Sequence, residues 1–161
     1  MKKGMIVAAA AVGVSGPVAA QDRGWLDVQT VVEKAEAVPD QDGRQRTKLG
    51  ALDAAGPGDQ LIYTVIFTNI SDQSADDVKV THPIPEELRY VRNSAVGPGT
   101  DICYSTDHGA SFAAADALVV QVADGGQRSA MPDDYTHIRW ILKNTLEAGA
   151  RGFARYRAIV R

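Results

Sequence analysis

A tight turn that leads into an alternating strand is the feature that most constrains how this chain can fold. Pro57-Gly58-Asp59 is a turn sequence, and residues 60–69 then read Gln-Leu-Ile-Tyr-Thr-Val-Ile-Phe-Thr-Asn. Leu61, Tyr63, Val65 and Phe67 alternate with the Ile and Thr residues between them. Successive side chains of a strand point to opposite faces, so this run predicts a strand that offers one continuous face to a core.

A second short strand follows after a polar gap. It comprises Val78-Lys79-Val80-Thr81 and runs into Pro83-Ile84-Pro85. We expect the two strands to be adjacent and antiparallel within a two-sheet sandwich. Trp140 fits a core tryptophan packed between the sheets, and Tyr63 fits a core tyrosine with a polar tip.

The rest of the chain repeats this pattern of short strands and turns. From Tyr135 to Leu142 the residues alternate, with Ile138 and Trp140 on one face, and residues 153–160 form a closing strand whose core face is Ala154, Tyr156, Ala158 and Val160. We count about eight strands with turn signals at nearly regular intervals, and we find no long segment with helical periodicity. This profile predicts an all-β, immunoglobulin-like, two-sheet antiparallel sandwich.

The segment before this domain divides into a strand and a polar stretch. Residues 25–32 alternate as a first strand, whereas residues 34–46 are polar and contain Pro39 and Gly43, which predicts a linker. Residues 47–52 could add a brief edge strand. We therefore expect a signal peptide at 1–20, a strand plus linker at 21–46, and the sandwich at 47–161. The first strand could complete its own sheet or that of a neighbouring molecule.

The N-terminus has the composition of a secretory signal peptide. Lys2 and Lys3 precede an apolar stretch at residues 5–14, and Val18-Ala19-Ala20 supplies small residues for cleavage before Gln21. The apolar stretch is about half of the ~20 residues that a membrane-spanning helix needs. The sequence therefore predicts an exported protein that is periplasmic, on the outer surface or extracellular, with no transmembrane segment after signal cleavage.

Charge and cysteine content limit the function classes. The chain has 17 Lys and Arg against 20 Asp and Glu, a net charge of −3. Removal of Lys2 and Lys3 leaves 15 against 20, or −5, so we expect neither nucleic acid nor an anionic membrane as a partner. The one cysteine, Cys103, cannot form an internal disulfide, and we expect a small buried apolar residue, with a free reactive thiol as the alternative.

The residues that could carry chemistry do not match known motifs. His82, His108 and His137 lack the i, i+2 or i, i+4 spacing of a metal site. Ser105, Asp107 and His137 could form a catalytic triad on paper, but no nucleophile elbow surrounds the serine. We therefore expect no catalytic residue and no cofactor.

Two further kinds of site were weighed in the same way. The acidic cluster of Asp72, Asp76 and Asp77 does not follow the calcium-loop pattern, so solvated loops are expected there, with weak calcium binding as the alternative. A Lys–Asn isopeptide bond is conceivable between Lys34 or Lys79 and one of the asparagines, Asn69 and Asn144. The closing strand contains no Asn or Asp, however, which disfavours it.

Residues from about 47 to 161 resemble the bacterial surface-repeat family called domain of unknown function eleven. The motif residues that carry the resemblance are Pro57, Gly58, Asp59, Tyr63, Asn69, Pro83, Pro85 and Trp140. His82 stands where the family usually has an aspartate before the proline. The resemblance implies an immunoglobulin-like fold and a place among surface proteins. It implies no activity, because the family has none assigned.

The leading hypothesis is an exported, non-catalytic structural or interaction module of the bacterial cell envelope or extracellular space. Its expected partner is another envelope or surface protein, or a second copy of itself. One alternative is a self-assembling surface-filament subunit that exchanges residues 25–32 between molecules. A second alternative is an exported hydrolase or a metal-dependent enzyme.

Overall fold

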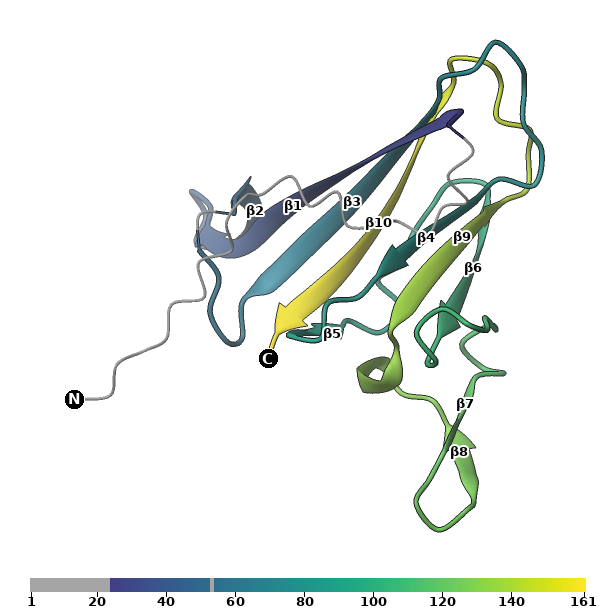
Figure 1. Ribbon diagram of the computed structural model, residues 1–161. Coiled ribbons are helices and arrows are strands. Elements are labelled where there is room, and N and C mark those ends of the chain that lie inside the picture. Colours follow the sequence, from purple (N-terminus) through teal and green to yellow (C-terminus); the bar gives the residue numbers. More distant parts are fainter. Residues whose placement is uncertain (1–23, 53) are drawn as a thin grey trace.

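The computed structural model describes residues 24–52 and 54–161, so the expected signal peptide at 1–20 lies outside the described residues. These residues form an all-β fold in which every pair of strands is antiparallel (Figure 1). The ten strands and one short 3-10 helix are β1 (Leu26–Pro39), β2 (Gln45–Ala51), β3 (Gln60–Asn69), β4 (Lys79–Pro83), β5 (Leu88–Tyr90), β6 (Thr100–Ser105), β7 (Val119–Gln121), β8 (Gln127–Ser129), η1 (Pro132–Asp134), β9 (His137–Leu142) and β10 (Arg151–Val160).

The strands form two main sheets and a separate hairpin. The larger sheet has five strands in the order β2-β1-β3-β10-β5, and the smaller has three in the order β4-β9-β6. The hairpin of β7 and β8 extends away from both sheets (Figure 1). In the larger sheet β3 is central, because it pairs with β1 along one edge and with β10 along the other.

One hydrophobic core lies between the two sheets. Val65 and Phe67 of β3 and Tyr156 of β10 share it with Ile138 and Trp140 of β9, and each of these side chains is at most 2% exposed. The Trp140 and Tyr156 rings face each other with centroids 6.3 Å apart. The predicted core faces of β3, β9 and β10 are therefore confirmed, except that Tyr63 and Val160 are only half-buried and pack against the core.

The prediction that the strands at 61–68 and 78–81 are adjacent is wrong. β3 belongs to the five-stranded sheet, whereas β4 belongs to the three-stranded sheet and pairs with β9. Both edges of β3 are already occupied by β1 and β10, so β4 has no edge of β3 to join. The connection at residues 70–78 crosses from one sheet to the other.

The prediction of a polar linker at residues 34–46 is also wrong. β1 continues to Pro39 and forms a hairpin with β2, so the expected domain boundary at 46/47 falls inside a strand. Asp40 holds the hairpin turn, because its Oδ1 accepts hydrogen bonds from the backbone N–H groups of Asp42 and Arg44, each at 2.9 Å. The expected edge strand at 47–52 is present as β2, which begins two residues earlier.

The polar stretch at 123–134 contains β8 and η1. Val122 and Gly126 close the β7–β8 turn with backbone hydrogen bonds, and Arg128 makes a bidentate ion pair with Asp134 at its base, at 2.6 and 2.7 Å. Within residues 24–52 and 54–161, no helix has the length and apolar character needed to cross a membrane.

Candidate functional site

The Pro57-Gly58-Asp59 motif forms a turn that joins the start of β3 to the end of β10. Asp59 N–H donates to the Gly56 carbonyl at 3.0 Å, and Gly58 has φ +90°, which places glycine at the position where a type II turn requires positive φ. The Asp59 carboxylate accepts a bond from Gly56 N–H and pairs with Lys34 of β1 at 2.9 Å. These contacts hold the pKa of Asp59 below its ordinary value. The motif therefore has a structural role.

Asn69 clamps the two loops at the far end of β3. Its side chain is fully buried, and its Nδ2 donates to the carbonyls of Gln73 and Leu146 at 2.8 and 2.9 Å. Its Oδ1 accepts hydrogen bonds from the N–H and hydroxyl of Ser71. One side chain thus ties the β3–β4 connection to the β9–β10 connection.

The aromatic motif residues meet in the core. Tyr63 stacks on Tyr156, its cross-strand partner, with centroids 4.9 Å apart, and Trp140 packs on the other side of Tyr156. In the described part of the chain, the Trp140 Nε1 is the one buried side-chain donor that lacks a hydrogen-bond partner. Pro83 ends β4, and the Pro85 carbonyl accepts from Leu88 N–H in the turn into β5.

His82 stands where the family resemblance leads us to expect an aspartate. It is 7% exposed, and its Nδ1 lies 3.1 Å from the Tyr156 hydroxyl, within hydrogen-bonding distance. Burial lowers the pKa of His82 to about 4. The ring is therefore neutral near pH 7 and belongs to the aromatic core.

Ser105, Asp107 and His137 come close together but do not form the hydrogen-bond chain of a triad. Ser105 is fully buried and donates directly to Asp107 Oδ1 at 2.7 Å. His137 Nδ1 instead lies 3.2 Å from the hydroxyl of Thr136. Asp107 also accepts bonds from the N–H and the hydroxyl of Ser111, and the hydroxyls of Ser105 and Ser111 depress its pKa strongly. The group acts as a clamp for the loop after β6.

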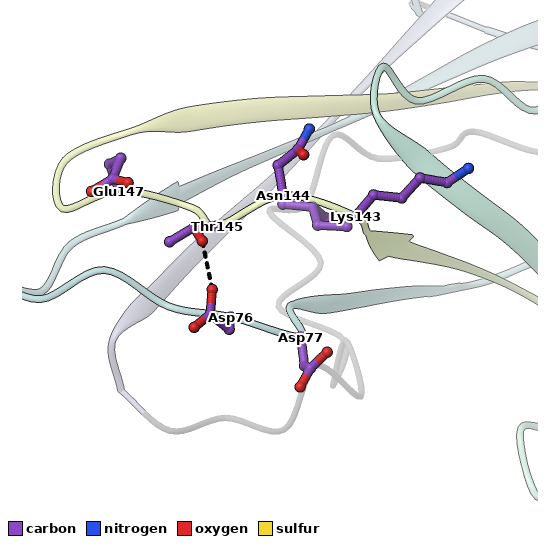
Figure 2. A pocket seen from close by; sticks show the side chains of 7 residues that line it. Asp76, Asp77, Lys143, Asn144, Thr145 and Glu147 are labelled. Atoms are coloured by element: carbon purple, nitrogen blue, oxygen red, sulfur yellow. Dashed lines mark hydrogen bonds between the residues drawn. The ribbon is translucent and has the colours of Figure 1, made fainter.

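Two residues of the acidic cluster, Asp76 and Asp77, line an open depression of about 590 Å³, and Asp72 does not (Figure 2). Asp76 accepts a hydrogen bond from Thr145 Oγ1 at 2.6 Å, and Asp77 and Glu147 lie nearby on the same two loops. Lys143 extends away from these carboxylates and pairs with Asp101 at 2.7 Å. Across residues 24–52 and 54–161, no three His, Cys, Asp or Glu side chains gather as a metal site would require.

The structure also shows the surroundings of Cys103 and of the residues considered for an isopeptide bond. Cys103 is half-buried, not fully buried as expected, and burial raises the pKa of its thiol. Lys34 contacts Asp59, while the Asn69 amide is held by backbone carbonyls, so the structure does not bring these two isopeptide candidates together.

The most distinctive polar surface is the side of the five-stranded sheet that faces away from the core, which we call the outer face; two of its residues on β3, Ile62 and Thr64, are buried at 7% and 9% exposure. It carries every second residue of the three central strands: Asp27, Gln29, Val31 and Glu33 of β1, Ile62, Thr64, Ile66 and Thr68 of β3, and Arg151, Phe153, Arg155 and Arg157 of β10. Their neighbours along β3 and β10 point into the core.

The arginines of the outer face lack acidic partners. Among the described residues, Arg151, Arg155 and Arg157 form no ion pair. Threonines orient two of them, because Arg155 Nε donates to Thr64 at 3.0 Å and Arg151 Nε donates to Thr68 at 3.3 Å. The terminal Nη groups of these two guanidinium groups can thereby donate hydrogen bonds to a carboxylate of another molecule.

Exposed apolar side chains accompany these arginines. Val31 is 44% exposed, Phe153 is 48% exposed, and Val96, which bridges to Arg155, is 49% exposed. A shallow depression of about 370 Å³ lies around Phe153 between the arginines at 151 and 155. The sequence signal for this surface was present in the closing strand, where Arg, Phe, Arg and Arg recur at every second position from 151 to 157. That alternation predicts the non-core side of the strand but not the residues that lie beside it on β3 and β1.

Comparison of the chain with protein-family models, with curated proteins and with solved structures found no match.

Proposed function

We propose that this chain is an exported, non-catalytic structural or interaction module of the bacterial cell envelope or extracellular space. Its two sheets would form an immunoglobulin-like sandwich, as the resemblance to the surface-repeat family implies. The N-terminal sequence supports export, because a basic start, an apolar stretch and small residues precede Gln21.

The observation that carries the proposal is the outer face. Three arginines that form no ion pair with any described residue lie on β10 beside the half-exposed Phe153 and Val31. Arginine and aromatic side chains supply much of the binding energy in protein interfaces. A broad face on a rigid sheet suits the binding of another macromolecule better than the turnover of a small one.

Photo-crosslinking in the native cell tests this proposal. The full chain, tagged after Arg161, carries a photoreactive amino acid in place of Phe153 or, as a control, in place of Val119 on the β7–β8 hairpin. Val119 is 47% exposed, so the two positions are matched in accessibility. We expect the chain to be cleaved before Gln21, and position 153 to give a discrete crosslinked product that position 119 does not give. An uncleaved protein that stays inside the cell would contradict the proposal. The absence of a crosslinked macromolecule at position 153 would also contradict it.

A further inference from the structure

The outer face carries acidic groups on β1 opposite the arginines of β10. Thr68 pairs across the sheet with both Asp27 and Arg151, so these three residues form one row. Ile62 forms a similar row with Glu33 and Arg157. In each row two strand spacings, about 10 Å, separate the acid from the base. Within the described residues, neither acid makes an ion pair with an arginine of its own row.

We propose that the outer face binds the outer face of a second copy of this chain. In this arrangement Asp27 and Glu33 of each copy pair with Arg151 and Arg157 of the other. The inference rests on the proposed function as an interaction module, and it names the surface and the partner.

A two-fold axis that runs along β3, midway between the copies, produces this pairing. Rotation about such an axis keeps each row at its height and exchanges the β1 side of the sheet with the β10 side. Asp27 of one copy then lies over Arg151 of the other, and Glu33 lies over Arg157. Packed sheets are separated by about 10 Å, a gap that two facing side chains can span. All four ion pairs of the dimer form from this one symmetry operation.

The charge pattern disfavours the other simple two-fold arrangement. An axis perpendicular to the strands at the middle of the face would place β10 on β10 and reverse the order of its rows, so that Arg151 would face Arg157 and, on β1, Asp27 would face Glu33. Like charges in direct contact cost free energy and exclude the wrong arrangement. The outer face is therefore self-complementary in one orientation only.

Three apolar residues of the outer face, Val31, Ile66 and Phe153, lie between the two charged rows. Ile66 and Phe153 occupy the row next to Asp27 and Arg151, and Val31 lies in the row between Phe153 and Glu33. Contact between two copies would remove Val31 and Phe153 from water, and each is now nearly half exposed. These two central rows also carry Gln29 and Arg155, so the ion pairs of the end rows would enclose a centre of mixed apolar and polar residues.

The size of the face fits a reversible dimer. Three strands and ten residues span about 14 by 33 Å, or roughly 460 Å², and the flanking β2 and β5 raise this to at most about 800 Å². Specific interfaces bury about 800 Å² per partner. We therefore expect dissociation to be measurable by dilution, and because part of the attraction is electrostatic we expect salt to weaken it.

Charge reversal tests the pairing directly. Variant one carries Arg151→Glu and Arg157→Glu, and variant two carries Asp27→Lys and Glu33→Lys. Each variant alone places like charges in contact across the interface. A mixture of the two restores opposite charges at all four pairs. Sedimentation velocity over a range of concentrations, on chains beginning at Gln21, measures the association of each variant and of the mixture. Circular dichroism and the thermal midpoint confirm that each variant is folded.

We expect the wild type to dimerise, each variant to dimerise at least tenfold more weakly, and the mixture to form a heterodimer with affinity close to that of the wild type. A control with Lys79→Glu and Arg92→Glu changes the net charge by the same amount, at exposed positions outside the paired rows, and should leave association unchanged.

A wild type that stays monomeric, a mixture that stays monomeric, or a control that weakens association equally would overturn the inference. Oligomers that resist denaturant and ignore the charge variants would also overturn it and would favour exchange of residues 25–32. A crosslink from position 153 to a different protein, with a monomeric wild type, would refute the dimer while supporting the interaction module.

Discussion

The two sides of β10 differ in almost every physical respect, although they alternate along one ten-residue strand. On the inner side Ala154, Tyr156 and Ala158 are fully buried. On the outer side Phe153 is 48% exposed and Arg151 and Arg157 are exposed. The inner side is closed by packing, while the outer side retains hydrogen-bonding capacity that nothing within the described residues uses. Period-two alternation thus lets one strand support the fold and present a binding surface independently.

Among substitutions that compare buried with exposed positions, the largest loss in the free energy of unfolding is expected at the buried Asn69. Asn69→Ala removes two donors and one acceptor, and leaves the Leu146 and Gln73 carbonyls without those bonds. We expect a loss of about 3–4 kcal/mol in the free energy of unfolding, measured by urea denaturation. The exposed Asn144→Ala is the control and should change it by less than about 0.5 kcal/mol. Equal effects at the two positions would refute the clamp.

Gly152 should give the next largest effect, because it faces the core beneath Phe67. A Cβ atom there would overlap Phe67 Cε2, which forces the ring or the strand to move. We expect Gly152→Ala to lower the free energy of unfolding by about 3 kcal/mol. Gly50→Ala on β2 adds the same methyl group with nothing within 4 Å, so it should be nearly neutral. A neutral Gly152→Ala would mean that the inner side is less tightly packed than described.

Acid should lower the free energy of unfolding, because the buried His82 resists protonation in the folded chain. Its pKa is about 4 in the folded chain, below the 6.5 of an unperturbed histidine, so the unfolded chain binds the proton more readily between these values. Stability should therefore fall as the pH drops from about 6.5 to about 4, by about 2–3 kcal/mol from this group. His137, whose pKa is also lowered by burial, adds a change of the same sign. His82→Gln should flatten the pH dependence of the urea midpoint in this window, and an unchanged slope would contradict the assignment.

The smallest effect on stability is expected on the outer face. Phe153→Thr keeps a strand-forming residue and removes an exposed ring, so the free energy of unfolding should change by less than about 0.5 kcal/mol. The same change should weaken dimer formation by several-fold in sedimentation velocity, because the ring lies in the proposed contact. A large loss of stability without any change in association would reverse the roles that we assign to the two sides.

Local pattern in the sequence predicted the faces of the strands well. Alternation placed Val65, Phe67, Tyr156 and Trp140 in the core, and all four are buried there. The turn at Pro57-Gly58 was predictable from its residue types, because proline and glycine have specific positions in a type II turn. These features depend on neighbours along the chain, which a sequence displays directly.

Features that depend on pairing between distant strands could not be predicted. Alternation gives the face of a strand but not its sheet, so β4 was placed beside β3 instead of beside β9. The β1–β2 hairpin lies at the edge of its sheet with many exposed polar residues, and it therefore resembled a linker. The rows that place Asp27 level with Arg151 exist only once the register of three strands is known.

Crosslinking at Ile66 tests most directly the claim that the outer face binds itself. Ile66 lies on β3, close to the proposed two-fold axis, so its two copies should face each other across about 10 Å. Ile66→Cys, made together with Cys103→Ser, is treated with a short bis-maleimide, and Val119→Cys in the same background is the control. We expect covalent dimers from position 66 that decrease when Arg151→Glu and Arg157→Glu are added, and none from position 119. Equal crosslinking at both positions, or none at position 66 at concentrations where the chain associates, would contradict the account.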